Sequence, residues 1–279
     1  MIYLDNAAST QIHSDVLDSM LPFLKEQYGN PSSIHRYGRL SRKAIHKARK
    51  QIASLINADP AEILITSGGT ESNNTVLIGI SSQFPDSQII TSSIEHDAIL
   101  EPCKKLISNG FQVNYLSVDK SGIINTMDLK NTISKKTSLV SIMFGNNEVG
   151  TIQPISEIVK ICHENKVVFH TDAVQAVGKV AIDVKELGVD LLSISSHKLH
   201  GPKGVGALYI KDGVKIDPMI LGGGQEFRLR SGTENVASIV GFGQACEIAQ
   251  NNLIENSSLI KKLQTLLVKR VLDEIPEVT

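Results

Sequence analysis

The stretch "VVFHTDAVQAVGKVAIDVKELGVDLLSISSHK", residues 167–198, carries the pattern that decides the fold. Two short apolar runs, residues 167–171 and 190–195, flank an amphipathic segment. Such runs are typical of buried strands, and the segment between them is long enough for a crossover connection. Polar residues follow each run, with Asp172 after the first and Lys198 after the second. The pattern predicts neighbouring parallel strands whose carboxyl ends carry an acid and a lysine.

The same alternation of short β-branched runs and amphipathic segments extends along the chain, without internal repeats or low-complexity linkers. Strands are predicted at residues 62–66, 88–91, 111–116, 138–144, 167–171, 190–195 and 204–210. The first helix is predicted to begin at a Ser14 cap and to end before Gly29, with an apolar stripe formed by Val16, Leu17, Met20, Leu21 and Leu24. The fold class is therefore α/β, with a mainly parallel sheet covered by helices and ligands bound beyond the carboxyl ends of the strands.

Composition narrows the class of protein. The 279 residues are 41% hydrophobic and 20% charged, which suits one large globular unit or two moderate ones. A net charge of -1 provides no global attraction to nucleic acid or to an anionic membrane, so neither is an expected partner. The N-terminus lacks the pattern of a secretion signal and no apolar run could span a bilayer, so we expect a cytoplasmic protein. Three distant cysteines predict reduced thiols and no metal site.

Two further segments, together with Asp172, place candidate site residues after predicted strands. "SGGTESNN" brings Gly69 and Thr70 to the start of a helix, where backbone N–H groups can bind a phosphate; a plain glycine turn with Thr70 as the helix cap is the alternative. Asp172 could likewise cap a following helix, with Gln175 one turn further on the same side. His96 in "IEHDAIL" could stack on an aromatic ligand or cap its own helix.

A lysine amine, an acid and a phosphate site together are what pyridoxal phosphate requires. The lysine holds the cofactor as a Schiff base, the acid pairs with the pyridinium nitrogen, and the third site binds the 5′-phosphate. Lys198, Asp172 and the Gly69–Thr70 turn supply these parts at strand ends. Pyridoxal 5′-phosphate is therefore the predicted cofactor.

Eight segments in order extend this prediction to a family. They are "YLDNAAST", "YGNPSSIHRYGR", "TSGGTESNN", "IEHDAIL", "FGNNEVGTIQP", "HTDAVQAVGK", "SSHKLHGPKGVGALYI" and "RSGTENV". Together they resemble the cysteine desulfurase branch of the class-V aminotransferases. The resemblance implies the large domain of a type I pyridoxal-phosphate-dependent transferase plus an incomplete small domain. It also implies conversion of L-cysteine to L-alanine, with sulfur passed on for iron–sulfur clusters or thiolated transfer RNA.

The resemblance also implies residue roles. Lys198 would anchor the cofactor and, with His96, transfer protons, while Asp172 would meet the ring nitrogen and Gln175 the phenolic oxygen. Asn147 would lie beside the cofactor and the substrate carboxylate. The phosphate would be bound by Gly69, Thr70, Ser195 and His197, and by Thr233 of the other subunit of a homodimer. A protein that accepts the sulfur, or a scaffold protein, is an implied further partner.

The resemblance suggests an arm of the small domain at residues 1–13, the cofactor-binding domain at 14–250, and the start of the small domain at 251–279. The family's nucleophilic cysteine and carboxylate-binding arginine lie beyond "VLDEIPEVT", where this sequence ends, so we expect a truncated chain that binds cofactor without family-like turnover. The cysteines present are predicted to be inert in helices: Cys103, Cys162 and Cys246.

Two segments and two alternative functions remain open at this stage. "GGGQEFRLRSGT" has Phe227 and Arg228 where the family has arginine and glycine, which leaves the path of this loop uncertain. The basic run over residues 36–50 is interpreted as the solvated face of a helix, with an acidic protein or transfer RNA as the alternative partner. The alternative functions are another class-V lyase or aminotransferase and a non-catalytic dimerising or partner-binding module.

Overall fold

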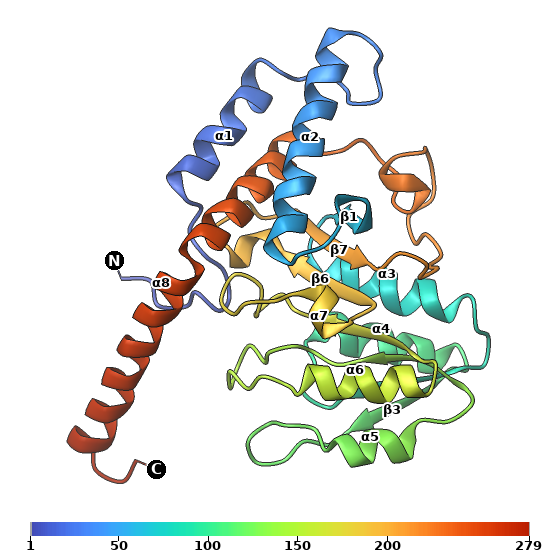
Figure 1. The fold of residues 1–279 in the computed structure, drawn as a ribbon, viewed down its shortest axis with the longest axis vertical. Helices are drawn as coiled ribbons and strands as arrows, with labels where there is room; N and C mark the ends of the chain where they lie inside the picture. Colours follow the sequence, from blue (N-terminus) through green and yellow to red (C-terminus); the bar gives the residue numbers. More distant parts are fainter. Residues whose placement is uncertain (1, 279) are drawn as a thin grey trace.

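A computed structural model describes residues 2–278 of the protein (Figure 1). The strands are β1 Ile63–Thr66, β2 Gln88–Ser92, β3 Gln112–Leu116, β4 Thr137–Ser141, β5 Val168–Asp172, β6 Leu191–Ser195 and β7 Gly206–Ile210. The helices are α1 Ser14–Lys25, α2 Arg36–Leu55, α3 Gly69–Ser81, α4 Asp97–Ser108, α5 Thr126–Thr132, α6 Ile155–Glu164, α7 Val184–Leu187 and α8 Val236–Glu274. Short 3-10 turns are η1 Pro60–Glu62, η2 Ser196–Lys198 and η3 Glu226–Arg228.

The strands form one sheet in the order β1-β7-β6-β5-β4-β2-β3. β7 is antiparallel to both of its neighbours, and all the other pairs are parallel. All seven predicted strands are present, with ends that differ by no more than three residues. The α/β prediction with a mainly parallel sheet is confirmed.

Helices cover both faces of the sheet, so alternate strand residues enter two separate cores. In β1, Ile63 and Ile65 join the core beneath α2, α6 and the start of α8, whereas Leu64 joins the core beneath α3 and α4. In β2, Ile90 joins the first of these cores and Ile89 joins the second. Burial on both faces explains why the strands are apolar runs rather than strictly alternating patterns.

The first helix differs from its prediction at its cap. His13 is the N-cap, with its Nδ1 accepting the N–H of Asp15, while Ser14 is the first helical residue. His13 is held at this position because its own N–H donates to the carbonyl of His200. Only part of the predicted stripe is buried, since Leu24 on the same helix is 61% exposed.

The crossover from β5 to β6 also differs from its prediction. Residues 173–183 form turns, with an isolated bridge between Val177 and Val180, and α7 is only four residues long. Gly178 has φ +76°, a conformation that interrupts helical geometry. Asp172 therefore caps no helix but accepts the N–H of Val174 in a tight turn.

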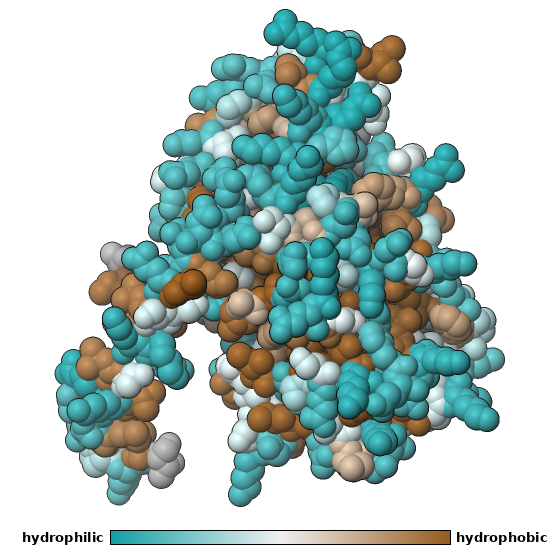
Figure 2. Space-filling model, viewed as in Figure 1, coloured by the Kyte–Doolittle hydropathy of each residue, from teal (hydrophilic) through white to brown (hydrophobic). Residues whose placement is uncertain are grey.

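Helix α8 runs without a break from Val236 to Glu274 and projects from the body of the molecule (Figure 1). Its buried residues all lie between Ala237 and Cys246. The projecting end carries apolar groups that remain exposed (Figure 2): Ile254, Leu259, Ile260, Leu263, Leu266, Leu267, Val268 and Leu272. The division of the chain near residue 250 stays a prediction. Within residues 2–278, no helix combines the length and apolar character needed to cross a membrane.

Candidate active site

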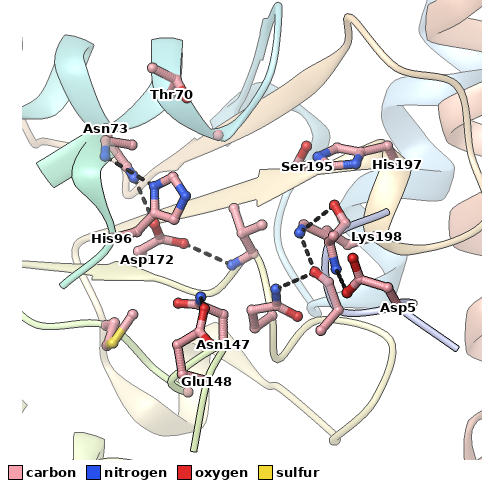
Figure 3. A pocket seen from close by; sticks show the side chains of 18 residues that line it. Asp5, Thr70, Asn73, His96, Asn147, Glu148, Asp172, Ser195, His197 and Lys198 are labelled. Carbon is pink, nitrogen blue, oxygen red and sulfur yellow. Dashed lines mark hydrogen bonds between the residues drawn. The ribbon is translucent and has the colours of Figure 1, made fainter. Parts of the chain in front are cut away.

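A cavity of about 630 Å³ opens at the carboxyl edge of the sheet. Nine of the ten predicted site residues line it: Gly69, Thr70, His96, Asn147, Asp172, Gln175, Ser195, His197 and Lys198 (Figure 3). They come from the ends of β1, β2, β4, β5 and β6 or from the segments that follow, because these five strands run in the same direction. The topology thus brings residues far apart in the sequence to one place.

Thr233 is the predicted residue that lies elsewhere. It lines a separate hollow of about 210 Å³, together with Ser67 and Arg230. Arg230 is held there by Glu71, since its Nε donates to Oε1 over 2.9 Å. The role predicted for Thr233, in the site of a partner subunit, stays a prediction.

Lys198 ends the η2 turn just beyond β6 and is half-buried. Its Nζ donates to the carbonyl oxygens of Ala7 and Ala8, the latter over 2.8 Å (Figure 3). Partial burial lowers the pKa of Lys198, while the negative charges of Asp5 and Asp172 oppose this effect. A lowered pKa favours the neutral amine, which is the form that acts as a nucleophile.

The segment that receives Lys198 is residues 5–13, called here the N-terminal arm. Its Thr10 hydroxyl donates to the carbonyl of His197 over 2.8 Å and accepts the N–H of His200 over 2.7 Å. The N–H of Thr10 donates to the same His197 carbonyl over 2.9 Å. The N-terminal arm is therefore fixed to the loop that carries Lys198 and forms one wall of the cavity.

Asp172 lies at the end of β5 and is only 7% exposed. Its Oδ2 accepts from Nδ2 of Asn73 over 2.6 Å, and its Oδ1 accepts the N–H of Val174 over 2.9 Å. Burial raises the pKa of Asp172, and these hydrogen bonds together with the positive charge of Lys198 act against that rise. No salt bridge reaches this carboxylate within residues 2–278, so a bound cation would stabilise it.

His170 lies two residues before Asp172 and has no exposed surface. Its ring nitrogens lie 2.8 Å from the Ser141 hydroxyl and 3.0 Å from the Ser193 hydroxyl. Burial lowers the pKa of His170 to about 3. This neutral imidazole therefore provides no positive charge to balance Asp172.

His96 has the capping role considered from sequence, whereas its stacking on an aromatic ligand stays a prediction. It is the N-cap of α4, with its Nδ1 accepting the N–H of Ala98 over 3.0 Å, and it also lines the cavity. The cap fixes the ring and makes Nδ1 an acceptor, so the neutral ring carries its proton on Nε2. Figure 3 shows His96 beside Asn73 and Asp172.

The start of α3 has the form of an anion site. The N-cap is Gly68 at φ 152°, and no side chain accepts from the first turn. The sequence alternative in which Thr70 caps the helix is wrong, because Thr70 lies inside the first turn and lines the cavity. A Cβ on Gly69 would lie 2.7 Å from Cγ2 of Val174, so any other residue would require the Val174 side chain to move. The free N–H groups of this turn, together with Ser195 and His197, can receive a phosphate.

Asn147 lies in the loop after β4 and donates from Nδ2 to Oε1 of Glu148 over 2.7 Å. The neighbouring Asn146 shapes this loop, since its Oδ1 accepts the N–H groups of Glu148 and Val149. Asn147 and Glu148 both line the cavity, near its solvent side. The loop thus brings an amide and a carboxylate to the cavity mouth.

Sequence reasoning missed three polar residues of this cavity: Asp5, Asn73 and Glu148. Asp5 and Glu148 lie within segments already quoted for the family, so their proximity to the cavity was the missing information. Asn73 lies four residues after Gly69 on α3, which puts it on the same side of the helix. That spacing is a signal that could have identified it.

The loop before Thr233 has left-handed backbone angles although Arg228 stands where the family has glycine. Glu226, Phe227 and Arg228 all have left-handed φ values, 43°, 58° and 66°. The buried Glu226 carboxylate accepts from both terminal nitrogens of Arg49, over 2.5 and 2.8 Å, and the Phe227 ring lies 4.9 Å from the Arg49 guanidinium. These contacts hold the backbone in the strained region despite the missing glycine.

None of the cysteines lines the cavity within residues 2–278. All three thiols are buried in helices, Cys103 in α4, Cys162 in α6 and Cys246 in α8. Burial raises the pKa of Cys103 and of Cys162 to about 12 and raises that of Cys246 further. The structure therefore agrees with the prediction that these thiols are inert.

Comparison with known proteins matches residues 2–279 to the family described as aminotransferase class-V. Cysteine desulfurase IscS of Methanosarcina thermophila is 51% identical over 278 residues, which cover 99% of this chain and 69% of that protein. A solved NifS-like protein is similar with a TM-score of 0.95 at 44% identity, over 98% of this chain and 76% of that one. SspA, solved in complex with cysteine, is similar with a TM-score of 0.87 at 43% identity, over 88% and 72% of the two chains.

Proposed function

Because the chain belongs to the class-V aminotransferases, and among them to the cysteine desulfurases, we propose that its cavity binds pyridoxal 5′-phosphate through Lys198 and accepts L-cysteine. The observation that carries this proposal is the meeting of a lysine amine, a buried acid and an uncapped helix start in one cavity. These are the three groups that the cofactor requires.

Two features of the cavity support the fit of this cofactor. The side-chain oxygen of Asn73 is buried without a hydrogen-bond partner, and the neighbouring Asp172 carboxylate lacks a cation. A protonated ring nitrogen beside Asp172 would supply the missing charge. At the other end, the first turn of α3 offers N–H groups to the 5′-phosphate.

When bound, the cofactor withdraws electrons from the α-carbon of an amino acid and so acidifies its α-proton. Lys198 would hold the cofactor and would remove or return that proton, a role that the lowering of its pKa by burial supports. Asp172 would favour positive charge on the ring nitrogen, and His96 would offer the N–H of its Nε2 to the cavity. Asn147 would orient the substrate carboxylate.

Transfer of sulfur needs a thiolate that reaches the substrate. The three thiols of this chain are buried in helices, so they are not assigned this role. We propose that the chain of residues 1–279 binds cofactor and cysteine but does not by itself sustain alanine production. The proposal also includes a homodimer in which Thr233 serves the partner's site. A protein would accept the sulfur, for iron–sulfur clusters or for thiolation of transfer RNA. The proposed location is cytoplasmic.

The test is spectroscopic and chemical. Purified protein incubated with pyridoxal phosphate should absorb visible light, and borohydride should fix the cofactor to Lys198, as located by peptide mass spectrometry. Lys198→Ala should abolish the fixed adduct, whereas Lys185→Ala, at an exposed lysine on α7, should leave it unchanged. A wild-type protein that stays colourless and unlabelled with the cofactor would contradict the proposal.

Two further measurements separate the remaining alternatives. Alanine with sulfide as products would support desulfuration, whereas an oxo acid would indicate an aminotransferase. Sedimentation should report a dimer that tightens with cofactor, since a ligand bound across an interface stabilises it. A monomer with full cofactor occupancy would contradict a site shared between subunits.

A further inference from the structure

Gln175 lies between two groups that fix the direction of its side-chain amide. Its Oε1 accepts from Nζ of Lys179 over 2.8 Å, and its Nε2 donates to the carbonyl oxygen of Ala7 over 2.8 Å. The same Ala7 carbonyl also accepts from Nζ of Lys198. One amide and one carbonyl thus connect two lysines, of which only Lys198 lines the cavity.

The chemistry of the two neighbours leaves one orientation of this amide. A lysine ammonium is only a donor, so the end of Gln175 that faces Lys179 must be the oxygen. A carbonyl is only an acceptor, so the end that faces Ala7 must be the NH₂ group. A flipped amide would bring donor against donor and acceptor against acceptor, and both hydrogen bonds would be lost. Lys179 and the Ala7 carbonyl thus favour the same orientation, in which the NH₂ group of Gln175 points toward Ala7, a residue that lines the cavity.

The backbone around Lys179 is held firmly. A Cβ on the preceding Gly178 would lie 2.4 Å from Leu199, and φ +76° at this glycine disfavours any other residue. On the other side, the hydroxyl of Ser257 in α8 donates to the carbonyl of Lys179 over 2.8 Å. Lys179 itself is half-buried, so its ammonium has limited freedom to leave Gln175.

We propose that Lys179 is a positioning residue that acts through Gln175, holding the amide so that its NH₂ group is presented to an oxygen anion in the cavity. The inference rests on the proposed function, because that oxygen is the phenolic oxygen of pyridoxal phosphate. The acceptor of this NH₂ group in the structure is the Ala7 carbonyl.

The protonation of Lys179 should make the orientation of the Gln175 amide depend on pH. Burial lowers the pKa of Lys179 to about 8, and the positive charge of Lys198 on η2 acts in the same direction. The group that approaches from α8 is the uncharged Ser257. Below pH 8 the ammonium is only a donor, whereas the neutral amine above that pH also has a lone pair and accepts a hydrogen bond. The orientation of Gln175 should therefore become less fixed as the pH rises through 8.

Cofactor binding provides the first test, with a double-mutant cycle on Lys179 and Gln175. Lys179→Met removes the donor and retains an apolar stem, so pyridoxal phosphate should bind roughly twofold to tenfold more weakly, the effect of one hydrogen bond. Lys179→Arg should restore most of the affinity because it keeps a donor. Gln175→Leu combined with Lys179→Met should bind no more weakly than Gln175→Leu alone. Lys185→Met controls for the loss of a lysine charge.

Two outcomes would overturn the proposal. If Lys179→Met binds cofactor as tightly as wild type, Lys179 does not position Gln175. If the two substitutions add fully in the double variant, Lys179 acts by another route, such as its charge on Lys198. The absorption spectrum of the loaded protein should also lose part of its pH dependence near 8 in Lys179→Met but retain it in Lys185→Met.

A cofactor-free measurement separates this inference from the proposed function. Nuclear magnetic resonance of lysine labelled with carbon-13 at the ε carbon reports the pKa of Lys179 in the unloaded protein, expected near 8. Gln175→Leu removes the acceptor of the ammonium and should lower this pKa further, because the charged form loses a hydrogen bond. An unchanged pKa would show that the two side chains do not interact, whatever the protein binds.

Discussion

Glu95, the residue before His96, gives a prediction that the structure makes quantitative. Glu95 is buried, with 5% of its surface exposed, and its Oε1 accepts from the Ser92 hydroxyl over 2.6 Å and from the N–H of Met143 over 2.9 Å. Within residues 2–278 its Oε2 has no hydrogen-bond partner. Burial raises the pKa of Glu95 from 4.5 to about 8, and the negative charge of Asp172 contributes in the same direction. Glu95 is therefore protonated in the folded protein at neutral pH.

The sign of the effect follows from proton binding. Between pH 4.5 and 8 the folded protein holds a proton on Glu95 that the unfolded chain has released, so stability falls as the pH rises through this window. The span from 4.5 to about 8 at about 1.4 kcal/mol per pH unit amounts to about 5 kcal/mol. This is comparable with the whole stability of many domains.

Glu95→Gln isolates this effect, because glutamine has the shape of the protonated acid and does not titrate. Urea unfolding of both proteins at several pH values gives the difference between their free energies of unfolding. The variant should gain about 4 kcal/mol relative to wild type between pH 5 and pH 8. The lowered pKa of His170 makes stability rise with pH, opposite to the effect of Glu95. This contribution is the same in both proteins and cancels in the difference. A difference that stays constant over this range would refute the reasoning.

The remaining predictions concern the backbone and the thiols. Arg228→Gly should stabilise the protein by about 1 kcal/mol in thermal unfolding, because glycine adopts φ 66° without strain, whereas Arg228→Ala should not. Gly178→Ala should destabilise it by at least 1–3 kcal/mol, since the new Cβ would overlap Leu199 and φ is unfavourable; a stable variant would show that the turn can shift. The buried thiols should resist iodoacetamide until the protein unfolds, and rapid alkylation of the native protein would contradict their burial.

Much of the fold was predictable because burial on both faces of the sheet produces strong apolar runs. In β1, β2 and β6 every residue is buried, whereas the edge strand β3 is mostly exposed or half-buried. The residues after the parallel strands meet at one edge of the sheet. Helix starts were less predictable, since His13 and Gly68 replace the expected caps. Their selection depends on contacts made by residues distant in the sequence, such as the carbonyl of His200.

The residues of the candidate site also differ in how well the sequence predicts their positions. Lys198 and Asp172 follow strands directly, so their positions could be inferred from the chain alone. Asp5 could not, because it reaches the cavity on the N-terminal arm, whose position is set by bonds to the η2 loop. Lys179 has no sequence signal of its own, since its importance arises only from its contact with Gln175.

The bonds of the N-terminal arm also determine when the cavity can form during synthesis. Thr10 and His197 are 187 residues apart, and Ala7 and Lys198 are 191 apart. At roughly 5–20 residues per second, the arm waits on the order of 10–40 seconds for its partners to be made. The wall formed by the arm therefore cannot close before the loop that carries Lys198 has been made, and contacts so distant in the chain slow folding.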